Sequence, residues 1–186
     1  LANGIDDSEV QLNSSIIQKG VGNSTTIPYD ITTKEEADKV LLALTERVGM
    51  RLRKLGCMAR LVSVGVKTDS FFYYSHQVKL MNHINTTDEI FEHASILLVQ
   101  CWKGEPIRHL GVSVSDFSEI SCRQVSMFEK KNIEKIQDLD RVVDQIRSRY
   151  GTRSITRGVF VNGDVNPVQG GTNDSNFIMM GGYQHQ

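Results

Sequence analysis

Hydrophobic and polar positions repeat with two different periods along this chain, and the changes of period predict its elements. Hydrophobic residues three and four positions apart predict helices over 34–55 and 87–101, because that spacing gathers them on one helix face. Segments with alternating or β-prone residues predict four strands: 16–27, 58–67, 71–80 and 107–114. The first strand is expected to end at Pro28, because proline has no N–H with which to continue a ladder.

Short polar motifs predict where the helices begin and end. Thr33 and Glu36 have the spacing of a capping box, and Gly56 follows the last hydrophobic residue of the first helix. Thr87, followed by Asp88 and Glu89, is expected to cap the second helix.

The predicted order β-α-β-β-α-β indicates an α+β fold, in which two helices cover one face of a four-stranded sheet. Hydrophobic residues at helical spacing from Ile133 to Tyr150 predict a further, C-terminal helix that ends at Gly151. The expected parts of the chain are a linker, a compact domain, a second linker, the C-terminal helix and a loosely ordered tail: 1–15, 16–118, 119–131, 132–151 and 152–186.

The uncovered face of the predicted sheet has an unusual composition. Its residues on the two best-alternating strands are small or polar: Ser63, Gly65, Lys67, His109, Gly111 and Ser113. Such a face is either simply solvated or able to approach another backbone closely and donate hydrogen bonds to phosphates. The pattern alone leaves both interpretations open.

Charge changes this picture little. The formal net charge is -1, from Lys+Arg 21 against Asp+Glu 22, so only local placement can indicate a polyanion site. Arg47, Arg51 and Lys54 are expected on the solvated outer face of the first helix. Lys67, which ends a strand beside Thr68, is the better phosphate candidate.

The sequence lacks the residue patterns of several kinds of site. No strand end carries the clustered carboxylates that a two-metal polymerase site needs, and the histidines lack metal-ligand spacing, so catalysis, a metal and a small-molecule substrate are not expected in this chain. Three widely spaced cysteines fit a reducing cytoplasm. We expect neither a membrane span nor a signal peptide, and the start at Leu1 suggests a piece of a longer protein.

Four segments resemble, in order, one region of a known family. Ala2–Asp6 is similar to the end of a thumb, and Lys19–Pro28, Val66–Gln77 and Pro106–Val114 are similar to strands of the little finger in DinB/UmuC-type Y-family translesion DNA polymerases of bacteria. The resemblance covers residues 1 to about 157. It implies a sheet that lies against the duplex and contacts phosphates without reading the sequence, in DNA repair and damage tolerance.

The resemblance also implies specific partners and residues. The partner is damaged or primed duplex DNA, and the parent protein is a DNA-directed DNA polymerase whose palm, with Mg²⁺ as cofactor, lies outside this chain. The DNA-binding residues that it suggests are Lys19, Gly22, Ser24, Thr26, Ser63, Gly65, Lys67, Thr68, Ser75, Arg108, His109 and Ser113.

A pentapeptide in the second linker resembles the motif with which proteins bind the bacterial sliding clamp. It reads Gln124, Val125, Ser126, Met127 and Phe128, where Leu is usual at the second and fourth positions. The glutamine amide offers a polar anchor and the last two side chains fit a hydrophobic pocket. The competing interpretation of the whole chain is a stand-alone ferredoxin-like domain that binds RNA or protein, with Met127 and Phe128 packed on the third helix.

Overall fold

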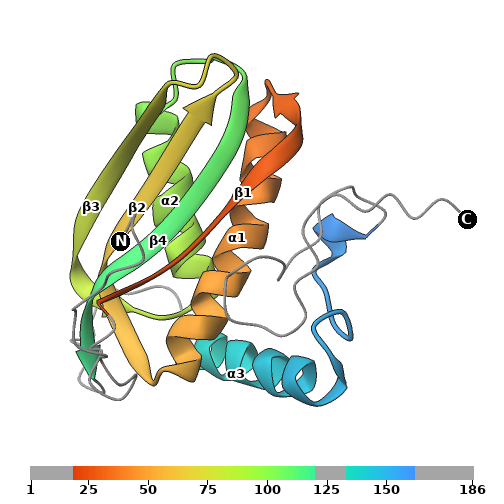
Figure 1. Cartoon of the computed structure of the whole chain (residues 1–186). Helices are drawn as coiled ribbons and strands as arrows, with labels where there is room; N and C mark the ends of the chain where they lie inside the picture. Colours follow the sequence, from red (N-terminus) through yellow and green to blue (C-terminus); the bar gives the residue numbers. More distant parts are fainter. Residues whose placement is uncertain (1–18, 120–132, 162–186) are drawn as a thin grey trace, which may run out of the picture.

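The computed structural model of the protein describes residues 19–119 and 133–161 (Figure 1). Its elements are, in chain order, β1 (Gly20–Ile31), α1 (Lys34–Lys54), β2 (Cys57–Thr68), β3 (Tyr73–Ile84), α2 (Thr87–Cys101), β4 (Ile107–Glu119), α3 (Ile133–Tyr150) and a short 3-10 helix, η2 (Gly158–Phe160). The order confirms the predicted β-α-β-β-α-β domain followed by a C-terminal helix.

The four strands form one antiparallel sheet in the order β1-β4-β2-β3. Figure 1 shows α1 and α2 behind this sheet, on one of its faces. Val62, Val64 and Val66 of β2 are fully buried on that side, as the alternation predicts. They pack with side chains of both helices, such as Leu41 and Ile90, and burying each such side chain contributes about 1.5–3 kcal/mol to folding.

The first helix begins and ends where its local signals predict. The Thr33 hydroxyl accepts a hydrogen bond from the Glu36 backbone N–H at 3.4 Å, and Gly56 follows the helix with φ +67°, a conformation that glycine adopts without steric cost. For α2 the prediction was wrong by one residue. Thr86, and not Thr87, is extended and accepts from the Glu89 N–H at 3.2 Å. The capping-box spacing identifies Thr86, which lies three residues before Glu89, whereas Thr87 lies three residues before Ile90.

The first strand does not end at Pro28. β1 continues to Ile31, and its pairing with β4 shifts between Thr26 and Ile31. Because β1 is an edge strand and Pro28 lies inside the shifted stretch, the missing N–H interrupts no regular ladder.

The third helix packs on the domain through polar side chains. The hydrophobic spacing predicted the helix correctly, but Leu139 and Tyr150 of that stripe are 61% and 66% exposed, whereas Asp140 and Arg147 are buried. Buried polar contacts with α1 and α2 therefore contribute to the attachment of α3, beside the half-buried residues of the stripe, Ile133, Ile136, Val143 and Ile146.

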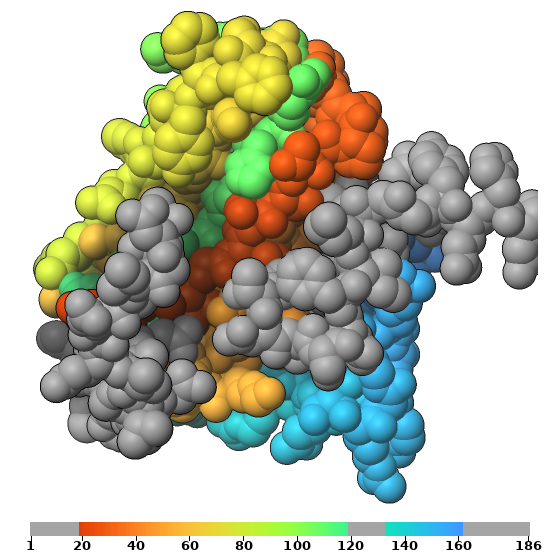
Figure 2. Space-filling model, viewed as in Figure 1, coloured from red at the N-terminus to blue at the C-terminus, as the bar shows by residue number. Residues whose placement is uncertain are grey.

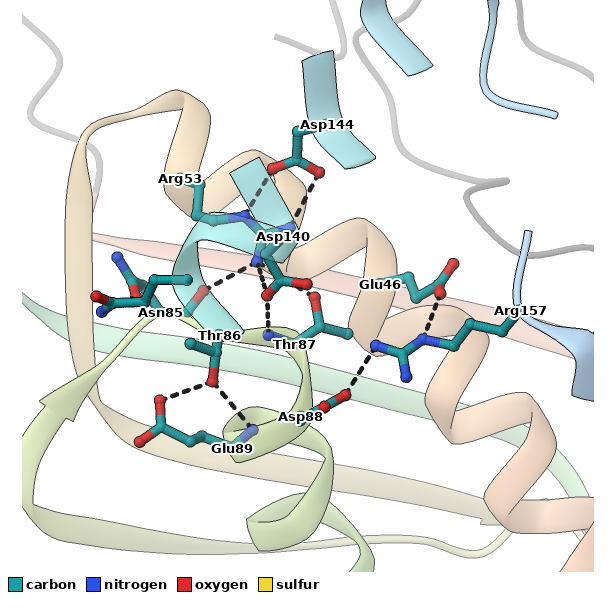
Figure 3. Close-up of polar contacts among 11 residues, drawn as sticks. Glu46, Arg53, Asn85, Thr86, Thr87, Asp88, Glu89, Asp140, Asp144 and Arg157 are labelled. Atoms are coloured by element: carbon teal, nitrogen blue, oxygen red, sulfur yellow. Dashed lines mark hydrogen bonds and ion pairs between the residues drawn. The ribbon is translucent and has the colours of Figure 1, made fainter. Parts of the chain in front are cut away.

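Arg53, at the end of α1, is the centre of this attachment (Figure 3). Its guanidinium donates to both carboxylate oxygens of Asp144, at 2.6 and 3.0 Å, and to Asp140 at 2.9 Å. It also donates to the backbone carbonyl of Asn85 at 3.0 Å. Asp140 in turn accepts from the backbone N–H of Thr87, at the start of α2, at 2.7 Å. We call these contacts the Arg53 network.

A second buried ion pair holds the chain that follows α3. Arg147 donates to Glu46 of α1 at 3.0 Å, and each side chain is only 4% exposed. Arg157 bridges Glu46, at 2.8 Å, and Asp88, at 2.7 Å, and Phe160 is buried. The prediction of a loosely ordered tail from residue 152 is therefore wrong for 152–161; residues 162–186 lie outside the described part.

The basic residues of α1 are also less exposed than predicted. Arg47 is only 7% exposed, and Arg51 is half-buried and donates to the backbone carbonyl of Gly22 at 2.9 Å. The prediction of a solvated outer face fails for these two residues, while Lys54 is exposed. The pattern of α1 alone does not show how much of its surface the rest of the protein contacts.

Candidate nucleic-acid interface

The sheet face opposite α1 and α2, here called the open face, is built from residues that the strand register brings side by side. Three rows cross all four strands in the order β1, β4, β2, β3: Gly22–Ser113–Ser63–Gln77, Ser24–Gly111–Gly65–Ser75 and Thr26–His109–Lys67–Tyr73. Figure 2 views the sheet from this side, and no described helix covers it. The face is thus smooth and rich in hydroxyl groups at its centre, with cationic and aromatic groups at one end.

Glycines keep the centre of the open face flat. A Cβ atom at Gly22 would lie 3.0 Å from the Ser113 Cβ, and one at Gly111 would lie 3.0 Å from the Ser24 Cβ. Both distances are shorter than ordinary van der Waals contact, so a larger residue would push its neighbour outward. A flat face with serine hydroxyls at its surface allows a phosphate backbone to approach closely and accept hydrogen bonds.

The cationic row combines Lys67 with a histidine held in place. The Nδ1 atom of His109 lies 3.1 Å from the Thr26 hydroxyl. Partial burial and, to a smaller extent, the neighbouring Lys67 charge lower the pKa of His109 below its usual value. His109 is therefore neutral near pH 7 and gains a proton only in more acid solution or beside an anion.

Most of the residues suggested for DNA binding lie together on the open face. They are Gly22, Ser24, Thr26, Ser63, Gly65, Lys67, Ser75, His109 and Ser113. Lys19 is exposed just before β1. Their contact with DNA stays a prediction, but the fold places them where one ligand could contact them all.

Two suggested residues are placed differently. Thr68 is 2% exposed and its side chain belongs to the helix-covered side, because it continues the alternation of Val64 and Val66. Thr68 is therefore withdrawn as a phosphate ligand. Arg108 donates to both carboxylate oxygens of Asp30 at 3.0 Å, and this pairing raises the pKa of Arg108. Its charge is largely compensated, so its contribution to binding an anion should be smaller than that of Lys67.

Sequence reasoning missed two residues of β3 and one cluster. Gln77 and Lys79, like Tyr73, are exposed at alternate positions of the edge strand, a signal that period two could have given. At the other end of the sheet Asp116, with φ +58°, accepts from Lys79 at 2.9 Å and Arg60 at 3.1 Å. These hydrogen bonds, from Lys79 first, lower the pKa of the Asp116 carboxyl. The carboxylate offsets the cations there, so Lys67 marks the more cationic end of the open face.

Other classes of site find no support in the described residues. Within 19–119 and 133–161 no group of three or more His, Cys, Asp or Glu side chains could hold a metal ion. No helix in that part of the chain is long and apolar enough to cross a membrane. The pentapeptide Gln124–Phe128 lies outside the described residues.

Comparison with known proteins gives consistent matches. The profile described as impB/mucB/samB family C-terminal domain matches residues 18–127. A DNA polymerase IV from Clostridium acetobutylicum is 38% identical over 160 residues, which cover 86% of this chain and 40% of that protein. DNA polymerase IV 2 of Bacillus subtilis is 36% identical over 160 residues, covering 84% and 38%. The chain thus spans about two fifths of the length of these relatives.

Among solved structures, the complex of the beta-clamp processivity factor and the little finger domain of PolIV matches with 19% identity and a TM-score of 0.47. The match covers 59% of this chain and 99% of that one.

Proposed function

This chain belongs to the impB/mucB/samB family and contains its C-terminal domain, and on that premise we propose that its open face binds primer-template duplex DNA through phosphates. The family match confirms the resemblance to the little finger of Y-family DNA polymerases. It favours this function over a stand-alone domain that binds RNA or protein. The observation that carries the proposal is the open face itself, where rows of small and hydroxylated residues end in Lys67 and His109.

The proposed binding does not depend on the base sequence. Serine and threonine hydroxyls and a single lysine charge are suited to phosphate oxygens, which are the same at every base pair. Apart from Tyr73, which lies across Gly65, the centre of the face has no long side chain, so it offers little that could reach base edges in a groove. Binding through phosphates suits a polymerase that must hold a duplex whose template strand is damaged.

The proposal extends to the parent protein and to a second partner. The relatives named DNA polymerase IV support a parent DNA polymerase, whose Mg²⁺ would be held by carboxylates outside this chain. The pentapeptide Gln124–Phe128 is proposed to bind the sliding clamp, on the strength of its similarity to the clamp-binding motif. Both partners would then be held by segments that follow one another in the chain.

Titrating the chain with two duplexes of unrelated sequence at several salt concentrations tests the DNA-binding proposal. Lys67→Ala should weaken both complexes equally and reduce the steepness of the salt dependence by about 0.9 in the log–log slope, the loss of one phosphate contact. Arg108→Ala should have a smaller effect, because Asp30 compensates its charge.

Lys39→Ala is the matched control, since Lys39 is an exposed lysine on α1, away from the open face. It should leave the slope unchanged. If Lys67→Ala behaved like this control, or altered the preference between the two sequences, the phosphate contact would be wrongly assigned.

Binding should also strengthen as the pH falls from about 7.5 to about 5.5, across the usual histidine range near 6.5. A nearby phosphate favours the protonated imidazole, so binding raises the lowered pKa of His109 and takes up a proton. His109→Gln should flatten the pH dependence of the dissociation constant, whereas His93→Gln on α2 should preserve it. An unchanged pH dependence in His109→Gln would show that other groups cause it.

A further inference from the structure

Three consecutive aromatic residues stand exposed where β2 turns into β3. Phe71, Phe72 and Tyr73 are 63%, 73% and 64% exposed. Figure 2 shows this turn, in yellow, projecting at the end of the sheet, and Figure 1 places it at the opposite end of the domain from α3. Side chains this exposed contribute little to folding through burial. An exposed group of large apolar side chains is typical of a binding site.

Hydrogen bonds hold the turn in a backbone conformation that is unfavourable for Phe71. The Thr68 N–H donates to the Phe72 carbonyl at 2.9 Å, and the Phe71 N–H donates to the Thr68 carbonyl at 3.0 Å. Asp69 accepts from the Ser70 N–H at 2.6 Å. Within it, Phe71 has φ +67°, a left-handed conformation that glycine or asparagine adopts far more easily than a bulky residue. Strain in an exposed aromatic residue points to a role outside folding.

Two cations lie against one of these rings, that of Phe71. The Lys67 Nζ is 4.9 Å and the Arg108 guanidinium 5.5 Å from the centre of the Phe71 ring. Tyr73 lies across Gly65 on the open face, since a Cβ atom at Gly65 would be 2.5 Å from the tyrosine oxygen. The nearby carboxylates are already engaged, Asp30 with Arg108 and Asp69 within the turn. The aromatic end of the sheet is therefore accompanied by a lysine charge free to attract an anion.

We propose that the turn from Asp69 to Tyr73 binds unpaired DNA bases by stacking on Phe71 and Phe72, while Lys67 contacts the adjoining phosphate. Every base has an aromatic face, and exposed aromatic side chains next to cations are how proteins hold single strands without reading them. Within a duplex the base faces are stacked on one another and closed to such rings. The inference rests on the proposed duplex binding, because it places a single-stranded extension beyond the end of a duplex on the open face.

The experiment compares a blunt duplex with the same duplex carrying a single-stranded 5′ extension of about six nucleotides, a length typical of one single-strand site. The wild-type chain should bind the extended DNA roughly tenfold more tightly, the order expected for stacked bases. Phe71→Gly and Phe72→Ala should each remove most of this preference and leave the affinity for blunt duplex unchanged. Lys67→Ala should weaken both complexes.

Two controls keep the test specific. Tyr150→Ala removes another exposed aromatic residue with an arginine 5.3 Å from its ring, but on α3, and should leave both affinities unchanged. Phe71→Gly should melt near the wild-type temperature, because relief of the strain at φ +67° offsets the conformational freedom that glycine adds to the unfolded chain. A loss of several degrees would show that the Phe71 ring is packed structure and would overturn the inference.

The outcomes separate this inference from the proposed function. Equal affinity for blunt and extended DNA overturns only the stacking, and leaves a protein surface as the partner of these aromatics. Preference for extended DNA that persists in Phe71→Gly and Phe72→Ala overturns it as well. A chain that binds neither DNA overturns both proposals.

Discussion

Replacing Arg53 by methionine should lower the free energy of unfolding by about 3–5 kcal/mol, the usual cost of removing one partner of a buried ion pair. The methionine preserves the apolar stem but leaves Asp140 and Asp144, 10% and 19% exposed, side by side without their shared cation. Urea denaturation followed by circular dichroism measures the loss.

The protein can relieve part of this cost by releasing α3. Contacts of Asp140 and Asp144 with Arg53 are a main part of its attachment, together with the Arg147–Glu46 pair, while Leu139 remains exposed. Hydrogen exchange should therefore show faster exchange over Ile133–Tyr150 in Arg53→Met, with the amides of β2 and β4 still protected. The loss of free energy is then limited by what the attachment of α3 itself contributes.

Arg141→Met is the matched control, because Arg141 forms an ion pair with Asp138 in which both side chains are 67% exposed. Such a pair contributes about 0–1 kcal/mol, so this variant should unfold like the wild type. Adding Asp140→Asn and Asp144→Asn to Arg53→Met removes the repulsion and should restore part of the stability. Equal stabilities of Arg53→Met and Arg141→Met would contradict a structural role for the Arg53 network.

Local sequence signals predicted the elements whose causes are local. The ends of α1 follow from the Thr33 cap and the Gly56 stop, each of which acts within a few residues. The buried side of β2 follows from the alternation of Val62, Val64 and Val66. The open face was found in the same way, because the residues opposite a buried stripe must lie on the other side of the strand.

Features that depend on distant residues escaped prediction. The periodicity of α3 predicts a helix, but it does not predict that Asp140 accepts a hydrogen bond from Arg53, 87 residues earlier in the chain. Pro28 is tolerated in β1 only because the strand lies at the sheet edge, which depends on the order of all four strands. Thr68 appears polar and terminal in the sequence, yet the alternation of β2 carries it into the buried layer.

The two cations at one end of the open face also differ for a reason that depends on distant residues. Arg108 and Lys67 look equivalent in the sequence, but the fold places Asp30, 78 positions before Arg108, against its guanidinium. Both cations lie over the Phe71 ring, so the ring does not distinguish them. Only the folded pairing of β1 with β4 distinguishes the two, and it is the reason why their alanine variants should differ.

Replacing Met127 and Phe128 together by alanine should abolish binding to the bacterial sliding clamp. If each side chain contributes about 1.5–3 kcal/mol on burial, the double variant loses about 3–6 kcal/mol, or roughly two to four orders of magnitude in affinity. The dissociation constant of a micromolar complex would then rise to about 0.1–10 mM. Gln124→Ala should weaken it less, since it removes one polar anchor. Isothermal titration of the purified clamp with each variant measures these changes.

The place of the pentapeptide in the chain decides which control is informative. It lies between Glu119, where β4 ends, and Ile133, where α3 begins, so its loss should leave both the sheet and the attachment of α3 intact. Leu139→Ala with Val142→Ala removes two exposed apolar side chains of α3 and should preserve clamp binding. Thermal melts of both double variants should match the wild type.

Clamp binding that survives the loss of Met127 and Phe128 would exclude the pentapeptide as the docking element. A melting temperature lowered by several degrees would instead mean that these two side chains are packed within the fold, as the competing interpretation of the sequence holds.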